Sequence, residues 1–136
     1  RFGVILGQDG GALEKMVPAY RLFMGGKLGD GQQWFPWMHL EDLIRALMFV
    51  ARNDTLQGPV NCCAPHPVRN EEFSKTLASH LKRPSLFQVP RAALNLAAGE
   101  LGTVVLNSQR AVPEKLSASG FDFQYPTVEE ALQDLV

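Results

Sequence analysis

The chain has 136 residues, 46% of them hydrophobic and 20% charged, and a mean hydropathy close to zero, which is the composition of one globular domain. Its 13 basic and 14 acidic residues give a net charge of −1 and form no long run of either sign, so we expect no nucleic-acid partner. No apolar stretch approaches the roughly 18 residues that span a bilayer, so we expect no membrane partner either.

The N-terminal part of the chain predicts a buried strand followed by a helix. The continuous apolar run RFGVILG, residues 1–7, is typical of a strand inside a parallel sheet. Residues 12–24 have helical spacing, and Pro18 is expected to kink or divide that helix. A glycine-rich loop at 27–33 and an extended aromatic segment at 34–38 follow. A chain that opens on such a strand, without Met, is expected to be part of a longer protein.

The middle of the chain predicts a second helix and a second strand. Glu41 and Asp42 suit the first turn of a helix because carboxylates stabilise the positive end of its dipole. VNCCA, residues 60–64, has the composition of a short strand, and strand, helix and strand at this spacing predict a right-handed crossover between parallel strands. The apolar stripe of this helix consists of Leu40, Leu43, Ile44, Leu47, Met48 and Ala51.

A third helix is expected after Asn70, which can cap it. Residues 86–90 read as an extended segment. The apolar face of the third helix consists of Phe73, Leu77 and Leu81.

The last third of the chain reads as mostly helical. Helices are predicted at 90–98 and at 103–110, and a short one after Pro113. Residues 121–125, FDFQY, alternate apolar and polar side chains and are expected to form a strand. Thr127 with Glu130 three residues later predicts a capping box at the start of the final helix, with Ala131, Leu132 and Leu135 facing inward.

The loop GKLGDG, residues 26–31, is superficially similar to a glycine-rich nucleotide loop. Such a loop follows a strand and leads directly into a helix whose N-terminus faces the phosphate. Here the loop follows a helix and leads into an aromatic segment. We therefore favour a flexible turn beside a pocket over a phosphate site.

The stretch from Trp34 to Asp42 holds the candidate binding residues. His39 is either a polar contact for a substrate or a structural hydrogen-bonding residue beside the helix start, and Trp34 and Trp37 either line a pocket or belong to the core. Glu41 and Asp42 point about 100° apart around a helix and do not converge as a catalytic pair. No Tyr-x-x-x-Lys pair and no Gly-x-Ser-x-Gly motif occurs, so no catalytic residue is assigned.

Adjacent cysteines, Cys62 and Cys63, lie in a short apolar run and are expected to be buried, reduced thiols of a cytoplasmic protein. The three histidines, His39, His66 and His80, are scattered, and no Cys-x-x-Cys spacing occurs. The sequence therefore predicts no metal site.

Five segments follow one another in the order RFGVILG, GGALEKM, GDGQQWFPWMHLEDLIRAL, GPVNCCAPHPVRNEEFSKTLASHLKRP and VPEKLSASGFDFQYPTVEEALQDL. Together they resemble the YfcH-like epimerase-family proteins, which are extended or atypical short-chain dehydrogenase/reductases. The resemblance covers essentially the whole chain. Its specific feature is the combination of W-x-x-W-[IM]-H-x-[ED]-D-L with the later P-E-K-L-x-x-x-G-F-x-F-x-Y-P.

The resemblance implies an α/β fold, namely the C-terminal portion of a Rossmann-type doubly wound parallel sheet plus a mainly helical substrate-side lobe. Residues 1–63 would hold the last strands and the crossover helix, with a substrate-side insertion at about 8–38. Residues 64–136 would form a mostly helical substrate-side domain. By position, Gly3 and Val4 would pass near the nicotinamide of the cofactor.

The resemblance also implies the activity of a longer parent protein. That parent would be an NAD(P)-dependent oxidoreductase or nucleoside-diphosphate-sugar epimerase with NADP or NAD as its cofactor and a small molecule as its substrate. The family name suggests a nucleotide sugar as that substrate. The glycine loop and the Tyr-x-x-x-Lys helix would lie in the missing N-terminal half, so this chain alone would not be catalytically complete.

Within that picture Trp34, Trp37 and His39 are the candidate substrate-side residues. The alternative is a non-catalytic binding or interaction module derived from such an enzyme. Some relatives carry a cell-division-inhibitor label, for which these residues offer no mechanism. If the first strand lacks its inner neighbour, its apolar edge is unpaired, and we expect the isolated chain to self-associate through it.

Overall fold

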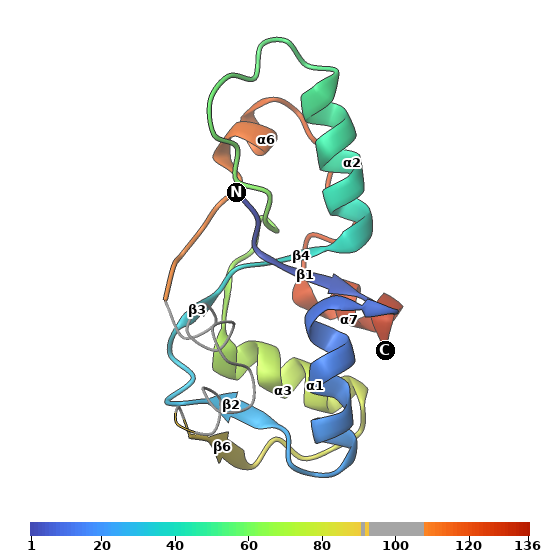
Figure 1. The fold of residues 1–136 in the computed structure, drawn as a ribbon, viewed down its shortest axis with the longest axis vertical. Coiled ribbons are helices and arrows are strands. Elements are labelled where there is room, and N and C mark those ends of the chain that lie inside the picture. The colour runs from blue at the N-terminus through green and yellow to red at the C-terminus, as the bar shows by residue number, and fades with distance from the viewer. Residues whose placement is uncertain (91, 93–107) are drawn as a thin grey trace.

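The computed structural model describes residues 1–90, 92 and 108–136 as an α/β arrangement with parallel strands (Figure 1). Within these residues no helix combines the length and the apolar character needed to cross a membrane. The helices predicted at 90–98 and 103–110 lie almost entirely outside them. The elements are β1 (Val4–Gly7), α1 (Gly11–Arg21), β2 (Gly26–Leu28), β3 (Trp34–Phe35), β4 (Trp37–His39), α2 (Leu40–Ala51), β5 (Val68–Arg69), α3 (Asn70–His80), β6 (Phe87–Val89), α6 (Glu114–Ala118) and α7 (Val128–Leu135).

The described strands pair into three two-stranded sheets. β1 and β4 run parallel across the middle of the molecule, with Val4 opposite Trp37 and Leu6 opposite His39 (Figure 1). β2 pairs with β6 in parallel, and β3 pairs with β5 in the antiparallel sense. The strand predicted from the first apolar run is confirmed as β1. The extended segment predicted at 86–90 is confirmed as β6.

The strand predicted at 60–64 is reduced to a single parallel bridge between Phe2 and Cys62, so that prediction is wrong in extent. The Gly3 N–H donates to the Cys62 carbonyl at 3.1 Å, but the next N–H, that of Val4, donates to the Pro36 carbonyl at 2.7 Å. The first strand therefore pairs with the 60–64 segment up to Gly3 and with the segment at Pro36 from Val4 onward. Only the residues before Val4 are left to pair with the 60–64 segment.

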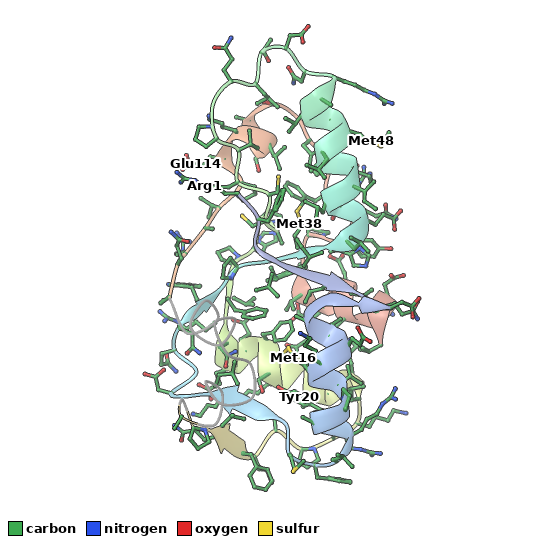
Figure 2. The ribbon with its side chains drawn as sticks, in the orientation of Figure 1. Arg1, Met16, Tyr20, Met38, Met48 and Glu114 are labelled. Atoms are coloured by element: carbon green, nitrogen blue, oxygen red, sulfur yellow. The ribbon has the colours of Figure 1, made fainter. Side chains whose placement is uncertain are left out.

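Helix α1 passes through Pro18 in one piece and ends at Arg21, so of the two outcomes expected at Pro18, a kink or a division, the division does not occur. A proline inside a helix removes one backbone hydrogen bond, and burial of Leu13 and Tyr20 on the helix offsets that loss. The Tyr20 hydroxyl lies 2.7 Å from the Ser74 hydroxyl on α3, which fixes the two helices to each other. Figure 2 shows Met16 and Tyr20 on the side of α1 that faces α3.

Two predictions about helix ends are confirmed and one is corrected. α6 follows Pro113, and α7 opens with the Thr127–Glu130 capping box. Asn70, by contrast, is the first residue of α3 and does not cap it. Its side-chain oxygen accepts a hydrogen bond from the Leu28 N–H at 2.7 Å, because the chain brings β2 against the start of this helix.

Residues 121–125 do not form the predicted strand. The N–H groups of Gln124 and Tyr125 donate to the carboxylate of Asp42, at 2.9 and 2.8 Å, instead of to a neighbouring strand. A side chain on α2 thus replaces the ladder that the alternating pattern predicted.

Two hydrophobic clusters hold the chain together, one on each side of β1 and β4. The larger lies among these strands, α1, α3 and α7, and the smaller lies under α2 and α6. Both free cysteines are buried, as predicted, with Cys62 in the smaller cluster. The innermost residues of the two clusters are Leu6, Phe35, Trp37, Phe73, Leu77 and Leu132, and Met38, Ala46 and Leu116.

Candidate functional site

The carboxyl ends of β1 and β4 meet at one edge, where β1 leads through a tight turn into α1 and β4 leads directly into α2. A cavity of about 320 Å³ opens at this edge. Ligands of open α/β sheets bind at the carboxyl ends of parallel strands, so this is the candidate site. Its lining residues are Ile5, Gly7, Gln8, Asp9, Gly10, Gly11 and Leu40.

The glycines of this turn let the chain fold back onto its own strand. Leu6 and Gly7 form antiparallel bridges with Gly11 and Gly10. Gly11 has a φ of 73°, and a Cβ at this position would lie 2.9 Å from the Ile5 carbonyl oxygen. Only glycine fits that place. Three of the seven lining residues are glycines, and Ile5, Gln8, Asp9 and Leu40 complete the lining.

Gly3 and Val4, the predicted cofactor contacts, lie on the strand before this edge and do not line the cavity. Gly3 has a packing reason of its own, because a Cβ there would lie 2.9 Å from the Pro36 carbonyl oxygen. The Val4 side chain packs against the larger core cluster. Their contact with a nicotinamide stays a prediction.

His39 is buried and uses both ring nitrogens. Nδ1 accepts a hydrogen bond from the Glu41 N–H at 3.1 Å and so caps α2, while Nε2 lies 3.2 Å from a carboxylate oxygen of Asp134 on α7. The ring also stacks on Tyr125, with 3.8 Å between ring centres. These contacts describe a joint between α2 and the C-terminal helix. A substrate contact through His39 stays a prediction.

The two tryptophans have different surroundings. Trp37 is 1% exposed and belongs to the larger core cluster. Trp34 is partly exposed on β3, and the guanidinium carbons of Arg69 and Arg110 lie 4.5 and 5.3 Å from its ring centre. The structure therefore separates Trp34 from Trp37 and His39, and their shared role as substrate contacts stays a prediction.

Sequence patterns alone do not indicate Arg69 and Arg110 as site residues. The register of β3 with β5 places Arg69 directly opposite Trp34, and Arg110 supplies the second cation. No local spacing signals this arrangement because the three residues are far apart in the chain. It gives the surface around Trp34 two positive charges that can bind an anion.

The carboxylate of Asp42 is structural. It is 1% exposed, accepts from the backbone at residues 124 and 125, and receives Arg45 at 2.9 Å. Glu41 beside it is exposed. The two carboxylates do not converge on one point, which agrees with the interpretation of both as helix-start residues.

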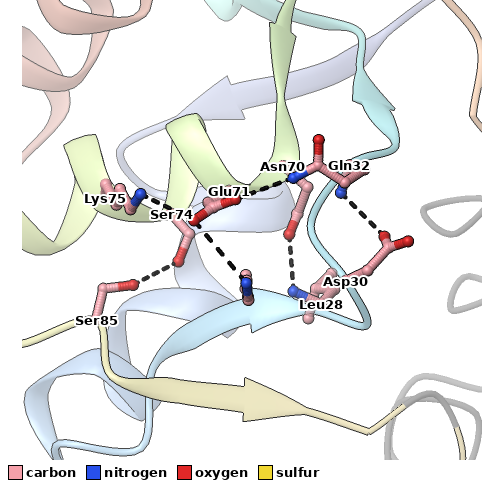
Figure 3. Close-up of polar contacts among 9 residues, drawn as sticks. Leu28, Asp30, Gln32, Asn70, Glu71, Ser74, Lys75 and Ser85 are labelled. Carbon is pink, nitrogen blue, oxygen red and sulfur yellow. Dashed lines mark hydrogen bonds and ion pairs between the residues drawn. The ribbon is translucent and has the colours of Figure 1, made fainter.

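Polar contacts fix the GKLGDG loop to the start of α3, as Figure 3 shows. Glu71 lies 2.8 Å from the Lys75 ammonium and 3.9 Å from that of Lys27, and the hydrogen bond from Lys75 together with the charge of Lys27 lowers the pKa of this carboxyl. The N–H groups of Leu28, Gly29, Gly31 and Gln32 all donate within the protein. The loop has no row of free N–H groups for a phosphate, which favours the interpretation as a turn.

Residues 89–135 match a family described as a domain of unknown function, DUF1731. The epimerase family protein SERP0438 of Staphylococcus epidermidis is 46% identical over all 136 residues, and an epimerase family protein of Staphylococcus aureus is 45% identical. The chain spans 46% and 45% of the length of these two relatives.

Among solved structures, human epimerase family protein SDR39U1 (isoform 2) with NADPH aligns with a TM-score of 0.92 at 32% identity, covering 99% of this chain and 46% of the human one. The chain is thus similar in structure to the C-terminal region of Rossmann-type epimerase proteins and spans less than half of their length. The nucleoside-diphosphate sugar epimerase of Corynebacterium glutamicum aligns with a TM-score of 0.69 at 31% identity over 97% of this chain and 24% of that protein. These two structural likenesses confirm the Rossmann-type α/β fold class expected from the sequence.

Proposed function

We propose that this chain is the C-terminal, substrate-side portion of an NAD(P)-dependent epimerase-type oxidoreductase and is not catalytically complete alone. The observation that carries the proposal is the TM-score of 0.92 with the human relative, whose structure contains NADPH. In this proposal residues 1–63, apart from the insertion at about 8–38, complete the Rossmann-type sheet, and residues 64–136 form the substrate-side domain.

The cavity at the end of β1 fits the edge of such a cofactor. Its volume of about 320 Å³ lies at the lower end of the range for ligand pockets. Its lining is mostly apolar, with Ile5, Leu40 and three glycines beside the polar residues Gln8 and Asp9. The nicotinamide cofactor, NADP or NAD, supplies hydride transfer to or from a carbinol or carbonyl carbon. In this chain Gly3 and Val4 would position the strand beside it.

The substrate class that we propose is a nucleotide sugar. The two guanidinium groups around Trp34 support it because a diphosphate needs cations and a flat base stacks on an aromatic ring. Trp37 and His39 would hold the neighbouring strand in place. The buried thiols of Cys62 and Cys63 fit the cytoplasmic setting in which such sugars are made and used.

The test is a full-length protein in which this chain follows the N-terminal segment of the Staphylococcus epidermidis relative that it does not cover. We expect it to bind NADPH or NADH in a fluorescence titration, and UDP-sugars to bind more weakly after Arg69→Ala or Arg110→Ala. Failure to bind either nicotinamide, while the intact relative binds one, would contradict the proposal. Tight capture of a protein partner that NADPH does not affect would favour the alternative, a non-catalytic interaction module.

A further inference from the structure

Helix α2 is apolar on two opposite sides. One side is turned inward, where Ala46 is fully buried in the smaller core cluster. The opposite side carries Leu40, Ile44, Leu47 and Met48, whose exposed fractions are 44%, 50%, 46% and 47%, together with exposed Ala51. We call these five residues the outer α2 face. Figure 2 shows Met38 on the inner side of the helix and Met48 away from it.

An apolar stripe along a helix normally faces the interior of a protein. Isolated exposed leucines are ordinary, but five apolar residues at positions i, i+4, i+7, i+8 and i+11 form a continuous stripe. Exposed charged residues lie beside this stripe, namely Glu41 in the first turn of α2 and Arg52 directly after its end. The pattern indicates that the outer α2 face is an internal surface for which this chain supplies only one side.

The outer α2 face begins at the candidate site. Leu40 lines the cavity at the end of β1, and its Cδ2 atom would lie 3.3 Å from a Cβ on Gly7. Phe2 is 64% exposed, and its bridge to Cys62 uses only one of the two edges of the strand. A partner that covers the helix face therefore also reaches the open cavity.

The length of the relatives points to the occupant. The chain spans 46% of the Staphylococcus epidermidis protein and 46% of the human one, so more than half of each relative lies outside the matched region. A second copy is the weaker candidate on area. The outer α2 face is about 16 Å long and about 10 Å wide, roughly 160 Å², which is far below the roughly 600 Å² that each of two separate chains contributes to a stable interface. A segment of the same polypeptide is held nearby by the chain and needs less area to pack.

We propose that the outer α2 face is the surface against which the N-terminal, cofactor-binding half of the same protein packs, and that this packing closes the cavity at the end of β1. The inference rests on the proposed function and adds the surface through which the two halves meet. It makes α2 a central helix of the complete protein and makes Leu40 part of both the packing surface and the cavity wall.

Thiol labelling tests this directly, because the native Cys62 and Cys63 are buried. Leu47→Cys places a thiol on the outer α2 face, and Asp54→Cys places a matched one in the exposed turn after α2. We expect a maleimide to label both in the dilute 136-residue chain. In the full-length protein described above, labelling of Leu47→Cys should be lost while that of Asp54→Cys is unchanged.

Several outcomes separate the two ideas. Full labelling of Leu47→Cys in a full-length protein that binds NADPH overturns the packing inference and leaves the proposed function standing. Loss of labelling without binding of either nicotinamide supports the packing and contradicts the function. Loss of labelling that is reversed on dilution to monomers shows that a second copy covers the face, which also overturns the inference. If the joined protein does not fold, the same two cysteines at the aligned positions of the intact Staphylococcus epidermidis protein give the same outcomes.

Discussion

Asp42 shows how one buried charge connects distant parts of this chain. It follows His39 by three residues, and although it carries a charge it is only 1% exposed. Two backbone N–H groups and the Arg45 guanidinium satisfy its oxygens. A buried carboxylate with this set of partners is stable only while all of them remain.

Replacing Asp42 by Ala is therefore expected to lower the free energy of unfolding by about 3 kcal/mol, since it leaves the N–H groups of Gln124 and Tyr125 without a partner. The matched control is Glu41→Ala, which removes the exposed carboxylate of the same helix turn and should change it by less than about 1 kcal/mol. Urea titrations of the two variants measure the difference. Equal effects would contradict the structural role of Asp42.

The buried thiol of Cys63 predicts a loss of stability at high pH. Burial first, and the neighbouring Cys62 second, raise the pKa of this thiol from its ordinary value near 9 to about 11. Between these values the folded chain keeps a proton that the unfolded chain has lost, so the free energy of unfolding falls as the pH rises from 9 to 11, by about 2 kcal/mol in total.

Cys63→Ala removes this titration, and its urea midpoint should fall less between pH 9 and pH 11 than that of the wild type. Below pH 9 the two proteins should show parallel pH dependence, because the thiol is protonated in both states there. Parallel curves through the whole range would show that Cys63 ionises equally in the folded and unfolded chain, against this prediction.

Among the elements, α7 depends most clearly on its first turn. The Thr127 hydroxyl accepts from the Glu130 N–H at 3.4 Å, and the Thr127 N–H donates to the Glu130 carboxylate at 3.1 Å. The helix has only eight residues and seals the larger core cluster with Val128, Ala131 and Leu132. A short helix of this kind needs its cap.

Thr127→Ala is expected to lower the free energy of unfolding by about 1 kcal/mol, while Thr127→Ser keeps the hydroxyl and should recover most of it. Chemical denaturation of the two variants under one set of conditions measures this. A loss in the serine variant as large as in the alanine variant would mean that the Thr127 methyl group, not the cap, is responsible.

The sequence predicts elements well where local rules decide them. The capping box at Thr127, the strand at the first apolar run and the short helix after Pro113 follow from spacing alone. The errors come from long-range partners. The Asp42 carboxylate, and not a neighbouring strand, accepts the hydrogen bonds from the N–H groups of residues 124 and 125. The Pro36 carbonyl, and not the 60–64 segment, accepts the hydrogen bond from the Val4 N–H.

The candidate site shows the same limit. The turn at Gly7–Gly11 can be expected from a strand that ends in glycines. Leu40, which also lines the cavity, is brought there only by the parallel pairing of β1 with β4. The two cations around Trp34 have no local signal at all. A site assembled by strand pairing can be located from sequence only after the pairing is known.

At the scale of the whole molecule, the described residues include several exposed apolar surfaces, among them the edge at Phe2 and the outer α2 face, with further exposed apolar side chains at 22–24 and 86–87. Unpaired strand edges and apolar patches promote association in water. We therefore expect the 136-residue chain to form dimers or larger species at tens of micromolar in sedimentation velocity, and a clean monomer there would contradict this.

The double variant Ile44→Ser/Leu47→Ser tests whether the outer α2 face is a surface through which the chain associates. These side chains are half exposed, so their replacement should leave the thermal midpoint of the chain nearly unchanged while removing apolar area from the helix. Association through the outer α2 face should then weaken, whereas association through the edge at Phe2 should persist, because strand pairing uses backbone groups that the substitutions do not touch. A lowered midpoint would instead show that α2 relies on its outer side chains within this chain, which its exposed fractions argue against.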